Sequence, residues 1–291
     1  MGSDGESGLA DGEAMVCFDF AALREVAHDP DAYGRLLTGM LFADPTIALA
    51  WTKVRSASAT LRVRLALRAT DTKLQALCWE TLRDPEALDG MPLVANQNLL
   101  FSRFTLSALT SALDLPARRA LRVAAVIANP SDLPRYGFQP LDTAAEIDRL
   151  REVLAAFQPR ILTRGSPHGS PTLPILLQTL RDGTEILVII AHGSIHAGKS
   201  VLWLEQDDGT ARRVTGAELT TQISALTGHP LLVFLAACRS AGDDTASEGL
   251  SGLGPLLGQV GVPAVVAMQG NISMATMARL LPSFLRELGS G

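Results

Sequence analysis

The sequence has few cysteines, and they are not clustered. Three cysteines occur in 291 residues, and they lie far apart without paired spacing. A disulfide framework and a zinc site both need cysteines at short, regular intervals, so neither is expected. The chain also has no basic-apolar leader and no apolar run of about 18 residues, the length of a membrane helix. These absences predict a cytoplasmic protein with no membrane segment.

Clustered positive charge is missing as well. The formal net charge is -5 and no stretch concentrates Lys and Arg, so the sequence predicts no nucleic-acid partner. The densest basic segment holds Arg62, Arg64 and Arg68, which alternate with aliphatic residues, a pattern typical of the solvent face of a half-buried strand. Hydrophobic residues make up 47% of the chain, which is enough core for one large domain or two modest ones.

Two cysteines have a simple structural interpretation. Cys17 and Cys78 lie among apolar neighbours and are expected to be small core residues, and a disulfide between them stays open. His192 and His196 share a segment without a helical pattern, and no third metal ligand lies near them in the sequence. Metal sites need such clusters, so no metal and no other cofactor is expected.

The pattern of apolar residues divides the chain into three parts. Residues 1–30 begin with a stretch rich in Gly, Ser and acidic residues and are expected to form a leader without fixed structure. Residues 31–117 form a mixed module, with a helix expected over 33–42 and a strand over 61–67. Residues 118–291 alternate strand and helix patterns, which predicts an α/β fold with a mostly parallel sheet. We expect strands at 121–127, 160–163, 186–191 and 263–268 and before Cys238, and helices at 142–157, 171–183, 216–226 and 274–288.

Two of the expected strands end in residues that can do chemistry. His192 closes the run ILVIIAHGS, and Cys238 closes the run LLVFLAACRSAG. Short apolar runs without polar alternation are typical of strands buried on both faces. Ligands of open α/β sheets bind beyond the carboxyl ends of the strands, so neighbouring strands can present an imidazole and a thiol side by side. The sequence therefore predicts a Cys-His dyad.

This pairing is suited to nucleophilic catalysis on a carbonyl group. A thiolate is the reactive form of cysteine, and a nearby histidine populates it at neutral pH. Gly193 has no side chain to obstruct a substrate, and its N–H together with that of Cys238 can bind the oxyanion of an acyl-transfer intermediate. Asp243 and Asp244, in the loop after the cysteine, are candidates to line a pocket for a basic substrate side chain, or are simply solvated.

A second motif overlaps the histidine. Residues Gly193 to Ser200 read GSIHAGKS and match the phosphate-binding pattern G-x-x-x-x-G-K-[ST], which alone would predict a nucleotide-binding protein. That motif functions only where a helix begins at its Lys-Ser end. Here an apolar run and an Asp-Asp-Gly turn follow, which predicts a hairpin and makes Lys199 a solvated loop residue. Nucleotide binding is thus the third hypothesis, behind the two considered next.

Several segments in order give the chain a family resemblance. They are TLRVRLAL from Thr60, LCWETLRDP with Trp79 and Glu80, LLFSRF with Arg103, RVAAVIANPSDL from Arg122, the two dyad segments, and GVPAVVAMQGNIS from Gly261. In order and spacing these segments resemble the CHAT domains of the caspase-like, clan CD cysteine peptidases. The resemblance implies a caspase-like mostly parallel sheet flanked by helices, preceded by a small β-rich module.

The resemblance also implies an activity and a setting. It implies a cysteine endopeptidase that acts on protein substrates through His192 and Cys238 and is activated by a partner or signal, in a bacterial defence (antiviral) or stress pathway. An inactive caspase-like scaffold that binds a partner through the same cleft is the alternative. Caspase-like folds carry a further strand after the last helix seen here, so we expect the core to be incomplete at Gly291 and a completing or regulatory chain or domain to follow.

Overall fold

The computed structural model describes residues 13–290, apart from positions 59, 69–70, 88–89, 107–120, 198, 239–252 and 268–273. The chain forms two compact units. The first comprises residues up to Leu67 together with Leu77–Phe104, and the second comprises Arg68–Ala76 and the residues from Thr105 onward.

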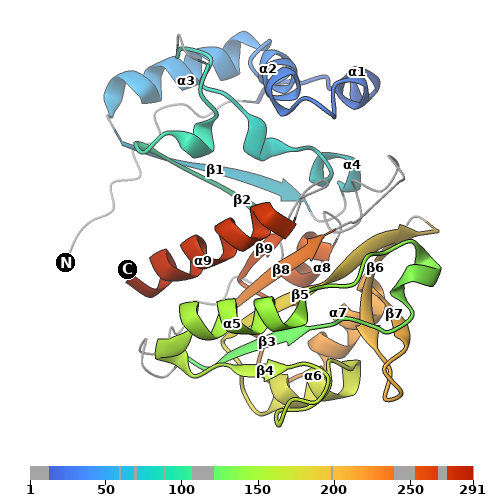
Figure 1. Ribbon diagram of the computed structural model, residues 1–291. Coiled ribbons are helices and arrows are strands. Elements are labelled where there is room, and N and C mark those ends of the chain that lie inside the picture. Colours follow the sequence, from blue (N-terminus) through green and yellow to red (C-terminus); the bar gives the residue numbers. More distant parts are fainter. Residues whose placement is uncertain are drawn as a thin grey trace. The chain divides into compact units, whose positions relative to one another are not determined.

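The first unit combines helices with a two-stranded sheet (Figure 1). Its elements are α1 (Phe20–Glu25), α2 (Pro30–Leu41), α3 (Pro45–Ala57), the paired strands β1 (Leu61–Arg68) and β2 (Leu99–Leu106), and the 3-10 helices η1 (Trp79–Thr81) and η2 (Leu93–Ala95). Each α-helix begins after an aspartate whose carboxylate accepts backbone N–H groups of the first turn, namely Asp19, Asp29 and Asp44. Such caps satisfy donors that have no partner within the helix.

The first unit differs from the sequence-based expectations in its leader and in its strand content, and it agrees with them in the exposure of the arginines on β1. The expected unstructured leader spans residues 1–30, yet Phe20–Glu25 form α1; residues 1–12 lie outside the described residues. The expected β-rich character is wrong, because the described part of this unit has three α-helices and only two strands. Asp-Pro at positions 44–45 is a cap followed by a proline in the first turn, which is the signal for α3 that the apolar pattern did not reveal. Arg62 and Arg64 are exposed on β1, as their alternation predicts.

The second unit is built on a seven-stranded, mostly parallel sheet (Figure 1). Its strands are β3 (Val123–Ile127), β4 (Arg160–Leu162), β5 (Ile186–His196), β6 (Lys199–Glu205), β7 (Ala211–Thr215), β8 (Leu232–Cys238) and β9 (Ala264–Ala267). Five strands are parallel in the order β4-β3-β5-β8-β9, whereas β6 pairs antiparallel with the end of β5 and β7 pairs antiparallel with β6. The predicted α/β class and parallel sheet are confirmed, and the arrangement is caspase-like.

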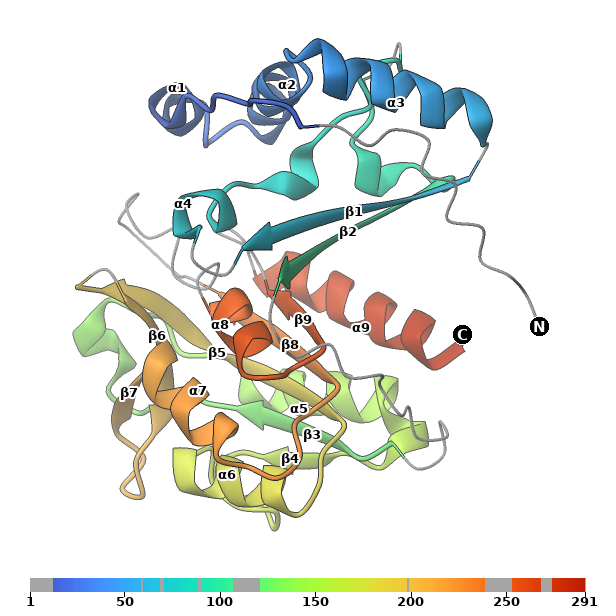
Figure 2. The ribbon, with the colours of Figure 1, turned by 180° about the vertical axis from the view of Figure 1, so that it is seen from behind.

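Helices cover both faces of this sheet, and Figures 1 and 2 show the two sides. The helices of this unit are α4 (Thr72–Gln75), α5 (Thr143–Val153), α6 (Leu173–Arg181), α7 (Gly216–Ser224), α8 (Leu253–Gln259) and α9 (Met274–Ser290). Even-numbered positions of β5 and β8, such as Val188 and Phe234, pack in the core under α5 and α9. Their odd-numbered neighbours, such as Ile189 and Leu235, pack under α6, α7 and α8. Burial on both faces explains why these strands are continuous apolar runs in the sequence.

Strand β5 changes partners along its length. Its first part pairs with β3 from Val123↔Ile186 to Ile127↔Ile190, and its last part pairs with β6 from His192↔Trp203 onward. The sequence predicts a strand that ends at residue 191, but the hairpin with β6 provides backbone partners that extend β5 to His196. Within the part of the chain that the structure describes, no helix is long and apolar enough to cross a membrane.

An ion pair at the start of β5 gives a prediction about stability. Glu185 accepts hydrogen bonds from Arg122 N at 2.6 Å and from Arg122 Nη2 at 2.7 Å, and the bonds from the arginine side chain hold the pKa of this carboxyl below its usual value. A lowered folded-state pKa contributes stability above the unfolded pKa of about 4.3, and the contribution is lost as the pH falls through the folded value.

We expect Glu185→Gln to lower the free energy of unfolding by about 1 kcal/mol at pH 7. The difference from the wild type should shrink as the pH falls below the unfolded pKa of about 4.3, and it should disappear once the pH is below the lowered folded-state pKa, because Glu185 is then protonated in both states. Urea denaturation of both proteins at pH 7 and at low pH measures this difference in the free energy of unfolding. A difference that did not change with pH would contradict a stabilising role for the ionised Glu185 carboxylate.

Candidate functional site

The backbones of His192 and Cys238 lie side by side. His192 is the Cα register partner of Cys238 on the parallel strand β8 and of Trp203 on the antiparallel strand β6. They form the last pair of this parallel ladder, so both lie where its carboxyl end is, the place where ligands of such sheets bind. The structure describes Cys238 through its backbone only.

The imidazole of His192 is held in a defined orientation. It is 1% exposed, and the ring of Phe138 stacks on it with centroids 4.9 Å apart and planes 27° apart. Its Nε2 lies 2.8 Å from the backbone oxygen of Gln139. A carbonyl oxygen can only accept a hydrogen bond, so Nε2 carries a proton and Nδ1 is the basic nitrogen of the neutral ring. The site therefore selects one tautomer of His192.

Phe138 and Gln139 belong to the loop between β3 and α5, whose residues Asn129 to Leu141 we call the histidine loop. Leu133 in this loop is fully buried and packs with Phe138, Val201 and Trp203. Gly137 has a φ of 79°, a conformation that favours glycine, and turns the chain so that the next residue reaches the imidazole. The sequence did not reveal this loop as part of the site, although its aromatic residues beside a glycine turn are a recognisable signal.

Gly193, the other candidate for binding an oxyanion, lies within β5. It is buried and stands opposite Leu202 of β6. The sequence places it just after the end of a strand, so its local setting differs from that expectation. Asp243 and Asp244, the candidate pocket residues, lie outside the described residues.

The phosphate-binding motif is overturned by the strands. Residues 193–196 belong to β5 and Lys199–Glu205 form β6, so strand, not helix, follows the Lys-Ser pair. The β6–β7 hairpin predicted for this region is confirmed. His196 lies four residues along β5 from His192, roughly 13 Å at the rise of a strand, and is exposed. It is therefore too distant to take the place of His192, the candidate base.

The remaining cysteines are free thiols. Cys17 is exposed, so its expected core position is wrong. Exposure alternates at the start of α1, where Phe18 and Phe20 are partly buried and Cys17 and Asp19 are exposed. Cys78 is half-buried, and burial raises the pKa of its thiol, the direction opposite to that of an activated nucleophile.

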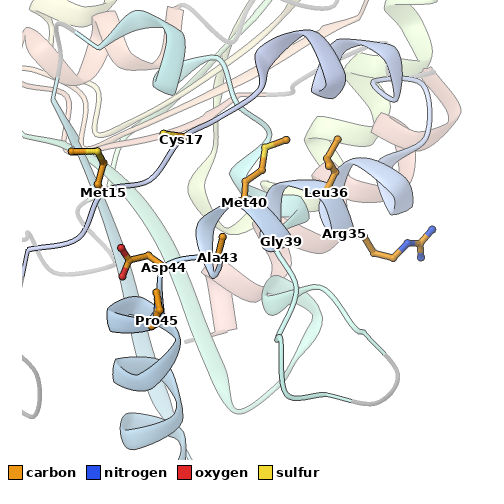
Figure 3. Close-up of a pocket in the computed structure, with 9 residues that line it drawn as sticks. All are labelled: Met15, Cys17, Arg35, Leu36, Gly39, Met40, Ala43, Asp44 and Pro45. Carbon is orange, nitrogen blue, oxygen red and sulfur yellow. The ribbon is translucent and has the colours of Figure 1, made fainter.

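A hollow of about 560 Å³ lies in the first unit and does not contain the dyad (Figure 3). Met15, Cys17, Met40 and Asp44 are among the residues that line it. Among the described residues, no group of His, Cys, Asp and Glu side chains has the arrangement of a metal site. Neither observation adds a residue to the candidates His192 and Cys238.

Comparison with known proteins identifies the family. The family model of the CHAT domain matches residues 31–291. Comparison with curated proteins gave no match. From residue 31 onward the match extends over both units, including β5 and β8 with their register pair His192 and Cys238. The chain thus belongs to the CHAT-domain family, which is related to the caspase-like cysteine peptidases.

Proposed function

We propose that this protein is a cysteine endopeptidase in which Cys238 is the nucleophile and His192 is the base. The observation that carries the proposal is the register pair His192↔Cys238, the last pair of the parallel strands β5 and β8, with His192 Nε2 held at 2.8 Å by the Gln139 carbonyl. Neighbouring strands lie about 4.8 Å apart, so side chains of register partners on one face are within reach of each other. Positions 192 and 238 share the parity of Val188 and Phe234, which face the same core.

The reaction follows from these groups. Nδ1 of His192 takes the proton of the Cys238 thiol, and the thiolate attacks the carbonyl carbon of a peptide bond. The imidazolium then gives its proton to the departing amine as the C–N bond breaks, leaving a thioester on Cys238. Water, deprotonated by the same imidazole, hydrolyses the thioester and restores the thiol.

Two further interactions support the charged states of this cycle. The Gln139 carbonyl accepts from Nε2 in both forms of the ring, and a hydrogen bond to the charged form is the stronger one, so it favours the imidazolium. In the proposal the N–H groups of Gly193 and Cys238 bind the oxyanion that forms when the thiolate attacks.

Burial of His192 supports a need for activation. The ring is 1% exposed with Phe138 stacked on it, so in this state little of it is open to a substrate. A partner or signal would then open the site, and an additional or completing chain is one form of such a partner. In the proposal the peptidase acts in a regulated bacterial defence or stress pathway, which the family resemblance supports. It prefers substrates with basic side chains, which the acidic residues Asp243 and Asp244 support.

The same burial also favours a second candidate, an inactive scaffold that binds a partner through this part of the sheet. In a scaffold, Cys238 would have the reactivity of an ordinary thiol. In a peptidase, its thiolate would be populated at neutral pH. The two candidates therefore differ in a measurable property of Cys238 that requires no known substrate.

The test compares alkylation of the three cysteines of the full chain by iodoacetamide at pH 6.5, read residue by residue with mass spectrometry. Exposed Cys17 is the internal reference for an accessible thiol. We expect Cys238 to react at least about tenfold faster than Cys17, because iodoacetamide is much smaller than a peptide substrate and does not need the opened site. Slower alkylation of Cys238 than of Cys17 would overturn the peptidase proposal and favour the scaffold.

A further inference from the structure

Glu205 is a buried carboxylate near the candidate site with no part in the proposed chemistry. It ends β6, is 2% exposed, and lies two residues after Trp203, the register partner of His192. Arg164 donates to its Oε2 from Nε at 3.0 Å and from Nη2 at 2.9 Å. Only the carboxylate of this pair is buried, because the side chain of Arg164 is 49% exposed, and an ion pair that solvent reaches adds little stability. The contacts that this ion pair makes with the neighbouring backbone are therefore more informative than its contribution to stability.

The ion pair holds the start of the histidine loop. Oε1 of Glu205 accepts a hydrogen bond from Asn129 N at 2.9 Å. Nη2 of Arg164 donates to Asn129 O at 3.3 Å. Both backbone polar groups of Asn129 are thus bound by the two partners of the ion pair. Asn129 is the second residue after β3, so the loop leaves the sheet at a fixed point.

The side chain of Asn129 fixes the other end of the loop. Its Oδ1 accepts from Leu141 N at 3.0 Å, and its Nδ2 donates to Leu141 O at 3.0 Å. Leu141 is itself buried in the core under α5. This clamp joins the two ends of the segment that carries Phe138 and Gln139, the residues that contact the His192 ring.

The turn between β6 and β7 completes the arrangement. Gly209 O accepts from Arg164 Nη2 at 2.7 Å and from Ser131 N at 3.0 Å. Gly209 has a φ of 80°, and a Cβ at this position would lie 2.8 Å from the Arg164 guanidinium carbon. Only glycine lets the turn approach the arginine so closely. The ion pair therefore contacts both the histidine loop and the β6–β7 hairpin.

We propose that Glu205, acting through Asn129, is a positioning residue for the dyad of His192 and Cys238. Its carboxylate fixes the histidine loop so that the Gln139 carbonyl stays on His192 Nε2 and Nδ1 remains the proton acceptor. This role rests on the proposed function. A looser loop weakens the bond to Nε2, and the imidazolium loses more from that than the neutral ring does.

The test uses Glu205→Gln, which keeps the size of the side chain and removes its charge. Glu185→Gln is the matched control, because it breaks a similar carboxylate pair, with Arg122, at the opposite end of β5. The full chain is labelled with 15N-histidine, and NMR gives the tautomer and pKa of His192, whose signals are assigned by their loss in His192→Ala. Alkylation of Cys238 is measured on the same variants.

In the wild type and in Glu185→Gln we expect a single tautomer protonated at Nε2. In Glu205→Gln we expect both tautomers, a His192 pKa lower by about one unit and alkylation of Cys238 slower by about tenfold at pH 7. An unchanged tautomer and pKa would overturn the positioning role even if Glu205→Gln melts at a lower temperature. If Glu205→Gln does not fold, Asn129→Ala gives the same test, because it removes the clamp and keeps the ion pair.

The two proposals fail in different ways. A His192 titration that shifts in Glu205→Gln, with an unreactive Cys238 in every protein, supports the positioning role and contradicts the peptidase. A reactive Cys238, together with a His192 titration that Glu205→Gln leaves unchanged, supports the peptidase and contradicts the positioning role.

Discussion

Replacing His192 by alanine is expected to slow the alkylation of Cys238 at pH 7 by about 30-fold or more, because an ordinary thiol with a pKa of about 8.5 is only about 3% ionised at that pH. The reaction of the variant should speed up about tenfold for each pH unit until the thiol is ionised. In the wild type the rate should be nearly constant across neutral pH, since His192 already holds the proton of the thiol.

His196→Ala is the matched control for this variant. His196 lies on the same strand, is exposed, and is roughly 13 Å along β5 from His192, so the proposal gives it no role in the dyad. Its replacement should leave the rate of Cys238 unchanged. Equal rates in wild type and His192→Ala, or equal losses in the two variants, would contradict the assignment of His192 as the base.

The second large effect is expected for Phe138→Ala. Phe138 is 7% exposed, stacks on His192 and packs edge-on against Trp203 with ring centroids 5.3 Å apart. Its truncation leaves a cavity against these rings, and we expect a loss of about 3 kcal/mol in the free energy of unfolding, measured by urea denaturation. Alkylation of Cys238 should also slow, because the Gln139 carbonyl loses its support.

Gln139→Ala distinguishes the role of the Gln139 backbone carbonyl from that of the Gln139 side chain. The side chain of Gln139 is exposed, and the atom that lies 2.8 Å from His192 Nε2 is its backbone oxygen. We therefore expect stability within about 0.5 kcal/mol of the wild type and an unchanged rate for Cys238. A fall in rate as large as that of Phe138→Ala would mean that the side chain of Gln139, and not its carbonyl, serves the site.

The sheet could be predicted from the sequence because its central strands are buried on both faces. The apolar runs that contain Val126, Val188 and Phe234 have no polar alternation, and each became a strand with one helix layer on either side. The first unit was harder, because α1 and α3 are marked mainly by their caps. Burial of Cys17 was predicted wrongly because apolar neighbours do not show which way an extended segment faces.

Some residues of the candidate site could be predicted from the sequence, and others could not. His192 and Cys238 could be singled out because each closes an apolar run, and the ends of parallel strands meet at one edge. Gln139 contributes a backbone carbonyl, which any residue would provide, so no sequence pattern reveals it. Glu205 and Asn129 are 76 residues apart, and only the fold brings them together. The match to a phosphate-binding motif failed because its letters fall on a hairpin, where no helix can bind an anion.

The distance between His192 Nδ1 and Cys238 Sγ in an experimental structure of the full chain tests the central claim most directly. The account predicts that both atoms lie on the face of the sheet that α5 and α9 cover, about 3 to 4 Å apart, with His192 Nε2 still bound to the Gln139 carbonyl. A thiol on the opposite face of β8, or one separated from the imidazole by a packed side chain, would contradict the dyad and leave the scaffold as the function of this fold.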